Sequence, residues 1–198
     1  LLIQQNLIDW FENHINKNTG LLTNTEENTT LKKDLLTGYV LATLTSTNTS
    51  FPDLLQQNLN SIVGIYDDHP DQFNLSITSL LLSLIYKTPK STSNPALEQT
   101  LANRILSFRK TEQTFNTTSF ISTDAAYALT SLITHVYETN NETIKTNTTV
   151  LLKHYQQLLN ENAYYSPWYT QPFSTIDSSF NLSTRSEEHT SELQSLLI

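Results

Sequence analysis

Histidine is the side chain best suited to acid–base or metal chemistry near neutral pH, and in this chain the histidines are scattered. None has a partner at the spacing that two metal ligands on one helix require. A lone histidine is more often a hydrogen-bonded or exposed side chain than a ligand, so we expect structural roles for the four histidines that precede residue 185: His14, His69, His135 and His154.

Three aspartates, Asp67, Asp68 and Asp71, surround His69 and carry the oxygen atoms that calcium prefers. Their spacing matches no calcium-binding loop, and an acidic helix end explains them equally well. The sequence therefore predicts no metal site at this position.

The patterns that mark common active sites are missing from the sequence. There is no H-E-x-x-H, no glycine-rich phosphate loop and no G-x-S-x-G, and the chain has only three glycines. Cysteine is absent, which excludes disulfides, thiolate metal sites and thiol catalysis within these 198 residues. We expect no cofactor.

The stretch from Ser122 to Tyr137, STDAAYALTSLITHVY, has the clearest helical pattern. Its apolar residues recur at gaps of three and four, so it is predicted to be a buried helix. Ser122 or Thr123 can cap the first turn, and Asp124 places negative charge at the positive end of the helix dipole.

Two earlier stretches repeat this apolar helix, because residues 36–44, 76–85 and 124–133 superpose at offsets of 40 and 48 residues. Such a period indicates stacked helical hairpins, with an apolar inner helix and an amphipathic outer helix in each. The outer helices are predicted at 2–16, 52–66, 95–108 and 144–159, and the inner ones at 34–45, 74–87 and 122–137. The expected fold is all-α, with the helical hairpins curling into a segment of a ring.

The net charge limits the kinds of partner that the chain can be expected to bind. With 11 basic and 19 acidic residues the net charge is −8, and no run of Lys or Arg occurs. This argues against binding to nucleic acid or to an anionic membrane surface. No apolar run approaches the roughly 20 residues of a membrane span, and no signal peptide is recognisable. Because the chain contains no Met, we expect it to be an internal piece of something longer.

Seven N-x-S/T triplets favour, without showing, a secreted glycoprotein. Composition explains most of them. Five of these asparagines fall in predicted loops or at predicted helix ends, where a glycan could be tolerated: Asn28, Asn48, Asn74, Asn116 and Asn141.

The carboxy-terminal part consists of an aromatic loop followed by a tail that we interpret as non-native. Tyr164, Tyr165, Trp168 and Tyr169 could line a cavity for a sugar or an isoprenoid, or could pin the loop over the barrel end by packing. From residue 185, RSEEHTSELQS resembles the translation of a sequencing-library adapter. We therefore assign residues 1–184 to one partial domain and exclude 185–198 as non-native.

Residues 173–182, FSTIDSSFNL, begin a further predicted inner helix, with Phe173, Ser174, Thr175 and Asp177 at its start. This segment resembles an F-S-T-x-D element in the thioester domain of α-macroglobulin and complement-like proteins. NLIDWFENHINKNTGLL is similar to that family's outer helix and turn, and DLLTGYVLATL to its inner helix. The resemblance covers about residues 1–183, and it implies an incomplete α/α toroid of the terpenoid-cyclase-like kind.

The resemblance implies a scaffold part of a large secreted protein that traps proteases or opsonises microbial surfaces in innate immunity. It implies partners among the other domains of that protein, and no enzyme activity. The reactive Cys–Gln bond would lie upstream. Counting from Gly20, the family's acyl-accepting His or Asn falls near Asn28 or Thr30. The alternative is a toroid enzyme, a polysaccharide lyase or a terpenoid-cyclase relative.

Overall fold

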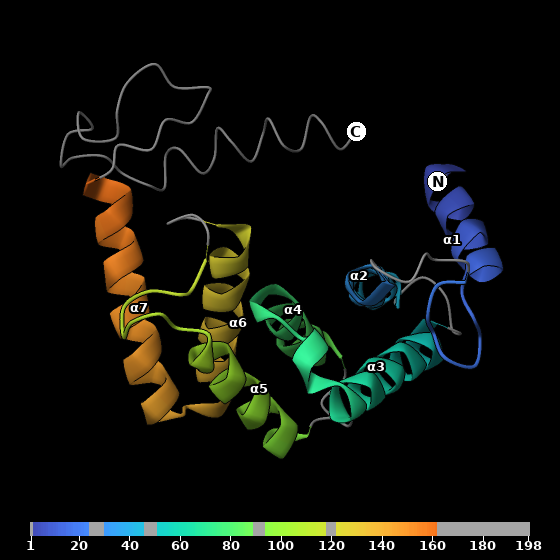
Figure 1. Ribbon diagram of the computed structural model, residues 1–198. Coiled ribbons are helices and arrows are strands. Elements are labelled where there is room, and N and C mark those ends of the chain that lie inside the picture. The colour runs from blue at the N-terminus through green and yellow to red at the C-terminus, as the bar shows by residue number, and fades with distance from the viewer. Residues whose placement is uncertain (1, 24–29, 46–50, 89–93, 118–121, 162–198) are drawn as a thin grey trace. The chain divides into compact units, whose positions relative to one another are not determined.

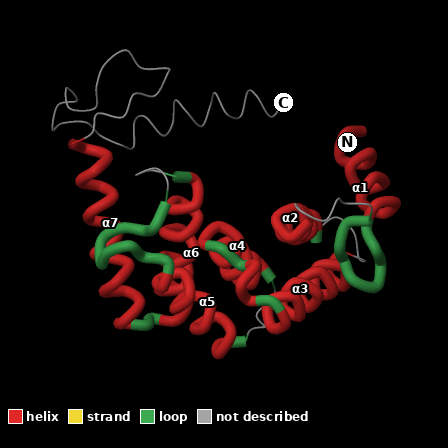
Figure 2. The backbone as a smooth tube through the Cα atoms, viewed as in Figure 1, coloured by secondary structure: helices red, strands yellow, loops and turns green. Residues whose placement is uncertain are grey.

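The computed structural model describes residues 2–23, 30–45, 51–88, 94–117 and 122–161, and this part of the chain is helical with no strand (Figure 2). The chain divides into two compact units, 1–152 and 153–198. Its helices are α1 (Leu2–His14), α2 (Thr30–Leu44), α3 (Phe51–Asp68), the 3-10 turn η2 (Pro70–Gln72), α4 (Leu75–Lys87), α5 (Pro95–Ser107), α6 (Thr123–Thr139) and α7 (Glu142–Glu161).

The all-α prediction is confirmed for the described residues, and three helix starts follow from capping side chains. Asn74 accepts a hydrogen bond from the Ile77 amide at 3.0 Å and begins α4. The side chains of Asn94 and Ser122 cap α5 and α6 in the same way, at 3.2 and 3.1 Å. Each cap satisfies an amide that the first helical turn leaves without a partner.

One predicted boundary differs by a full turn. Helix α2 begins at Thr30 rather than at residue 34. The first turn of α2 adds one apolar residue, the half-buried Leu31, beside the exposed Lys32 and Lys33. Apolar periodicity does not easily detect a helical turn with a single apolar residue.

Helix α4 is the centre of the packing in the first unit. It contacts α2 on one side and α6 on the other, and Figure 1 shows it between them. Leu81, Leu82 and Leu84 are completely buried. The three apolar segments that the sequence offsets superpose are therefore neighbours in space.

The amphipathic helices lie against this group. Helix α3 packs on α2, and α5 packs on α4 and α6. The amphipathic character predicted for the 52–66 helix is confirmed in α3, because Leu55, Leu59 and Ile62 are buried.

The expectation that the 122–137 helix is buried is only partly right. Ala125, Ala128, Leu132 and His135 form one buried stripe. Ile133, which the apolar pattern included, is 45% exposed. At 100° per residue it lies on a different side of α6 from the buried stripe.

The turn between α1 and α2 is fixed by Gly20, whose φ is +66°. A Cβ at this position would lie 2.5 Å from the Asn58 amide nitrogen and the Leu54 carbonyl oxygen of α3, so a larger residue would clash. The turn is thereby held directly against the α3 backbone.

A buried asparagine on α3 ties the turn to α2. The Asn58 amide donates to the Gly20 carbonyl at 2.9 Å and to the Asp34 carbonyl at 3.1 Å. The Asp34 carboxylate accepts from the Leu22 amide at 3.1 Å. Burial raises the pKa of Asp34, and the hydrogen bond from Leu22 opposes that rise.

We predict that Asn58→Ala lowers the free energy of unfolding by about 2–4 kcal/mol, because it removes two buried hydrogen bonds and leaves the Gly20 carbonyl without the amide that bonds it. Urea denaturation followed by circular dichroism measures the change. Asn60→Ala is the matched control on the same helix, since Asn60 is exposed, and it should change stability by less than about 0.5 kcal/mol. Equal losses in the two variants would contradict the role assigned to Asn58.

Candidate functional site

The main candidate site is a groove of about 520 Å³ on the side of α2, α4 and α6 that their packing leaves open. Its volume falls within the roughly 300–1,000 Å³ typical of small-molecule sites. It is lined by residues from all three helices: Leu36, Tyr39, Leu80, Ser83, Tyr86, Lys87, Tyr127, Thr130 and Thr134.

The walls of the groove are mainly apolar, and two of their hydroxyl groups are already hydrogen-bonded. The Tyr39 hydroxyl donates to the Leu80 carbonyl at 3.1 Å, and the Thr134 hydroxyl donates to the Thr130 carbonyl at 2.9 Å. Leu36 is 44% exposed. The groove therefore offers mostly aliphatic and aromatic surface.

Behind the groove, a tyrosine joins three helices through polar contacts. The Tyr86 hydroxyl of α4 lies 2.6 Å from His135 Nδ1 on α6 and 3.2 Å from Glu98 Oε2 on α5. His135 and Glu98 are buried, with 1% and 4% of their surface exposed. Both close contacts are satisfied when His135 Nδ1–H donates to Tyr86 and Tyr86 donates to Glu98. Nε2 of His135 is then a buried acceptor without a partner.

The electrostatics of this cluster favour a neutral tyrosine and a neutral histidine. Burial, followed by the negative charge of Glu98, raises the pKa of Tyr86. Burial lowers the pKa of His135, and Glu98 partly opposes that change. At neutral pH the cluster therefore holds its protons, and Tyr86 is a hydrogen-bond donor rather than a base.

Sequence reasoning missed this cluster, because Tyr86, Glu98 and His135 come from three separate helices. One signal was present. His135 continues the stripe of Ala125, Ala128 and Leu132, and a histidine on a buried stripe needs a polar partner. Nothing local identified that partner as a tyrosine 49 residues earlier.

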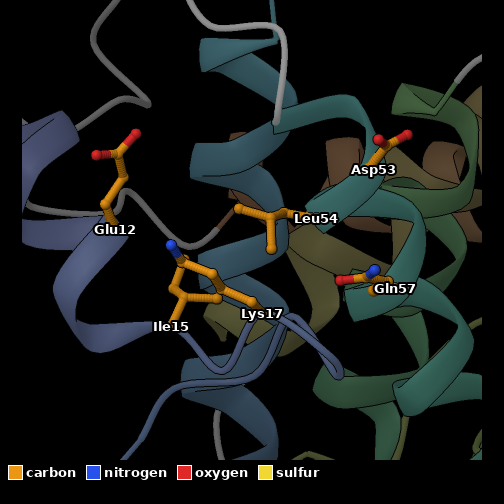
Figure 3. Close-up of a pocket in the computed structure, with 6 residues that line it drawn as sticks. All are labelled: Glu12, Ile15, Lys17, Asp53, Leu54 and Gln57. Atoms are coloured by element: carbon orange, nitrogen blue, oxygen red, sulfur yellow. The ribbon is translucent and has the colours of Figure 1, made fainter.

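A second, smaller pocket of about 220 Å³ lies between the end of α1, the following turn and α3 (Figure 3). Glu12, Lys17 and Asp53 place both signs of charge around it. Gln57 Oε1, also in its wall, is buried without a hydrogen-bond partner. Its volume is below the usual range for ligand sites, so the groove is the stronger candidate.

The residues predicted from the family resemblance fall mostly outside the described part of the chain. Thr30 is the first residue of α2, and nothing further is described of its side chain. The other predicted positions all lie in undescribed segments: Asn28, Phe173, Ser174, Thr175, Asp177 and the aromatic residues of the 164–173 loop.

The predicted glycosylation positions differ in their surroundings. Asn74 and Asn116 are exposed. Asn141 is half-buried, and its side-chain amide donates to Gln99 Oε1 at 2.6 Å. A glycan on that nitrogen would disturb the contact, so the structure favours Asn74 and Asn116 over Asn141. Asn28 and Asn48 lie outside the described residues.

Within the described ranges no group of three or more histidine, aspartate or glutamate side chains is arranged to hold a metal ion. Likewise, no helix in those ranges is long and apolar enough to cross a membrane. Compared with known proteins, the chain matches no family model, no curated protein and no solved structure.

We predict that stability falls as the pH drops below about 6.5, because His135 has a lowered pKa in the fold. The unfolded chain then binds a proton that the folded chain resists, so the stabilisation present above pH 6.5 is lost on acidification. The slope is at most about 1.4 kcal/mol per pH unit. Urea unfolding between pH 5 and about 7.5 measures it.

Replacing the histidine separates its contribution from that of other groups. His135→Gln should flatten the slope over this window, whereas His69→Gln should leave it unchanged, because His69 is exposed. An unaltered slope in His135→Gln would show that another group causes the pH dependence.

Proposed function

We propose that this chain is a scaffold segment of a thioester-type domain in a secreted α-macroglobulin or complement-like protein. The observation that carries the proposal is the contact of α4 with both α2 and α6. Three apolar helices at a repeating offset, with amphipathic helices packed against them, are the arrangement expected of successive hairpins in an α/α toroid. The toroid itself is part of the proposal.

The turn after α1 adds support. In the resemblance it corresponds to the family's turn between an outer and an inner helix. In this chain Gly20 has a positive φ and lies against the α3 backbone. The same turn is bonded to α3 through Ser61, whose hydroxyl donates to the Thr19 carbonyl at 2.9 Å. A fixed turn at this place is what a scaffold near a reactive centre would need.

The proposed role is structural. The hairpins would position a reactive bond carried elsewhere in the parent protein, since the chain has no cysteine. That bond would acylate proteases or microbial surfaces, and the glycan-accepting asparagines would face the extracellular fluid. The direct partners of this segment would be other domains of the same protein.

The test is to read the parent transcript upstream of Leu1 and to label the parent protein. We expect a Gly-Cys-x-Glu-Gln-like stretch shortly before Leu1, and covalent incorporation of labelled methylamine that replacement of its cysteine by alanine abolishes. A complete parent sequence with no such stretch would contradict membership of the family.

A toroid enzyme is the second candidate, and the part-buried Tyr86–His135 contact beside the groove favours it. A neutral tyrosine can act as a hydrogen-bond donor or general acid toward a reacting atom. The observation is weaker than the helix arrangement, because structural clusters also use such contacts.

If the enzyme candidate holds, the full chain should form unsaturated products from an acidic polysaccharide, detected by ultraviolet absorbance. Tyr86→Phe should then lower the rate by about a hundredfold or more. Tyr127→Phe is the matched control, because Tyr127 lines the same groove but no hydrogen bond is described for its hydroxyl. Absence of product from every polysaccharide tested, or equal rates in the two variants, would exclude a lyase that uses Tyr86.

A further inference from the structure

The groove on α2, α4 and α6 has a distribution of charge that selects for a ligand class. Among the described residues that line it, Lys87 alone carries a charge. Its ammonium group lies 5.7 Å from the centre of the Tyr39 ring. No carboxylate of the described residues pairs with it, although the chain as a whole is acidic. The groove thus has one cation at the end of α4, where the helix stops.

The rest of the lining is suited to hydrocarbon. Leu36 and Leu80 supply aliphatic surface, and the rings of Tyr39 and Tyr127 supply aromatic surface. The hydroxyl hydrogen of Tyr39 is bonded to a backbone carbonyl, and that of Tyr86 is directed to Glu98. Covering Tyr39 and Tyr86 with an apolar chain would therefore strand neither of these two donors, and so would cost little.

A sugar would fit this lining less well. Saccharide hydroxyls need several free donors and acceptors, and the Thr134 hydroxyl hydrogen is already bonded to the Thr130 carbonyl. Exposed apolar surface such as that of Leu36 gains more from contact with hydrocarbon than with hydroxyl groups. The positive charge of Lys87 and the mainly apolar lining together favour a molecule with an apolar body and one negatively charged end.

We propose that this groove binds an amphipathic monocarboxylate, with its hydrocarbon chain along Leu36, Leu80 and Tyr127 and its carboxylate at Lys87. This inference is independent of the proposed scaffold role. It depends only on the groove and its single cation. Burial of the ligand's hydrocarbon chain should contribute more to the binding free energy than its ion pair with Lys87, because an exposed ion pair is weak.

Isothermal titration of the full chain with decanoate, below its micelle concentration at neutral pH, tests the site. Decyltrimethylammonium is the charge-reversed probe with the same chain. We expect decanoate to bind with saturation and to bind more tightly than the cationic probe. Loss of the cation in Lys87→Gln should weaken decanoate binding about two- to fivefold, the size expected of an exposed ion pair.

Two further variants make the assignment sharper. Lys87→Glu should reverse the preference, so that decyltrimethylammonium becomes the tighter ligand, whereas Lys110→Glu should not, because Lys110 lies outside the groove. Leu36→Gln should weaken both probes. Leu36 is already 44% exposed, so this variant should fold, and circular dichroism checks that it does.

Three results would overturn the proposal. The first is no saturable binding of decanoate, and the second is equal binding of the two probes to the unaltered chain. The third is a dimer in light scattering that Leu36→Gln converts to monomers, which would show that a second copy of the chain covers the groove. Each result is independent of the transcript and methylamine experiments.

Discussion

The burial of α4 is the constraint on which the other helices depend. Its apolar residues point in nearly all directions, with Leu80, Leu81, Leu82 and Leu84 all at 5% exposure or less. A helix of this composition is stable only when neighbours cover it on several sides. Helices α2, α5 and α6 provide that cover. Its polar residues Thr78 and Ser79 are buried as well, and their hydroxyl groups donate to the backbone carbonyl groups of Phe73 and Leu75.

Two polar clusters fix the helices around this apolar centre. Asn58 bonds α3 to α2 and to the Gly20 turn, and Tyr86 bonds α4 to α5 and α6. Apolar packing tolerates small rotations of a helix, whereas buried hydrogen bonds tolerate few. Tyr86 belongs both to the wall of the groove and to the second cluster, so the cluster holds this part of the wall in place. A scaffold role and a ligand-binding role would both use that rigidity.

The sequence predicted the local features well and the non-local ones poorly. Helices α5 and α6 begin where the sequence predicted them, at the capping residues Asn94 and Ser122, because a cap acts within three residues of itself. The contact between Tyr86 and His135 could not be predicted, since it joins residues 49 apart whose meeting depends on how α4 and α6 pack. The exposure of Ile133 was missed for a similar reason: periodicity finds apolar positions but not the neighbour that covers them.

Hydrogen exchange read by mass spectrometry on the full chain tests the central position of α4 most directly. Amide hydrogens exchange when the backbone opens by local unfolding, and closely packed segments open least often. The amides of the most enclosed helix should therefore exchange last. We predict that peptides from Leu75–Lys87 exchange slowest, with peptides from Leu2–His14 far faster. Exchange of the α4 amides as fast as those of α1 would show that α4 is not enclosed, and would contradict the packing on which the scaffold and the groove both depend.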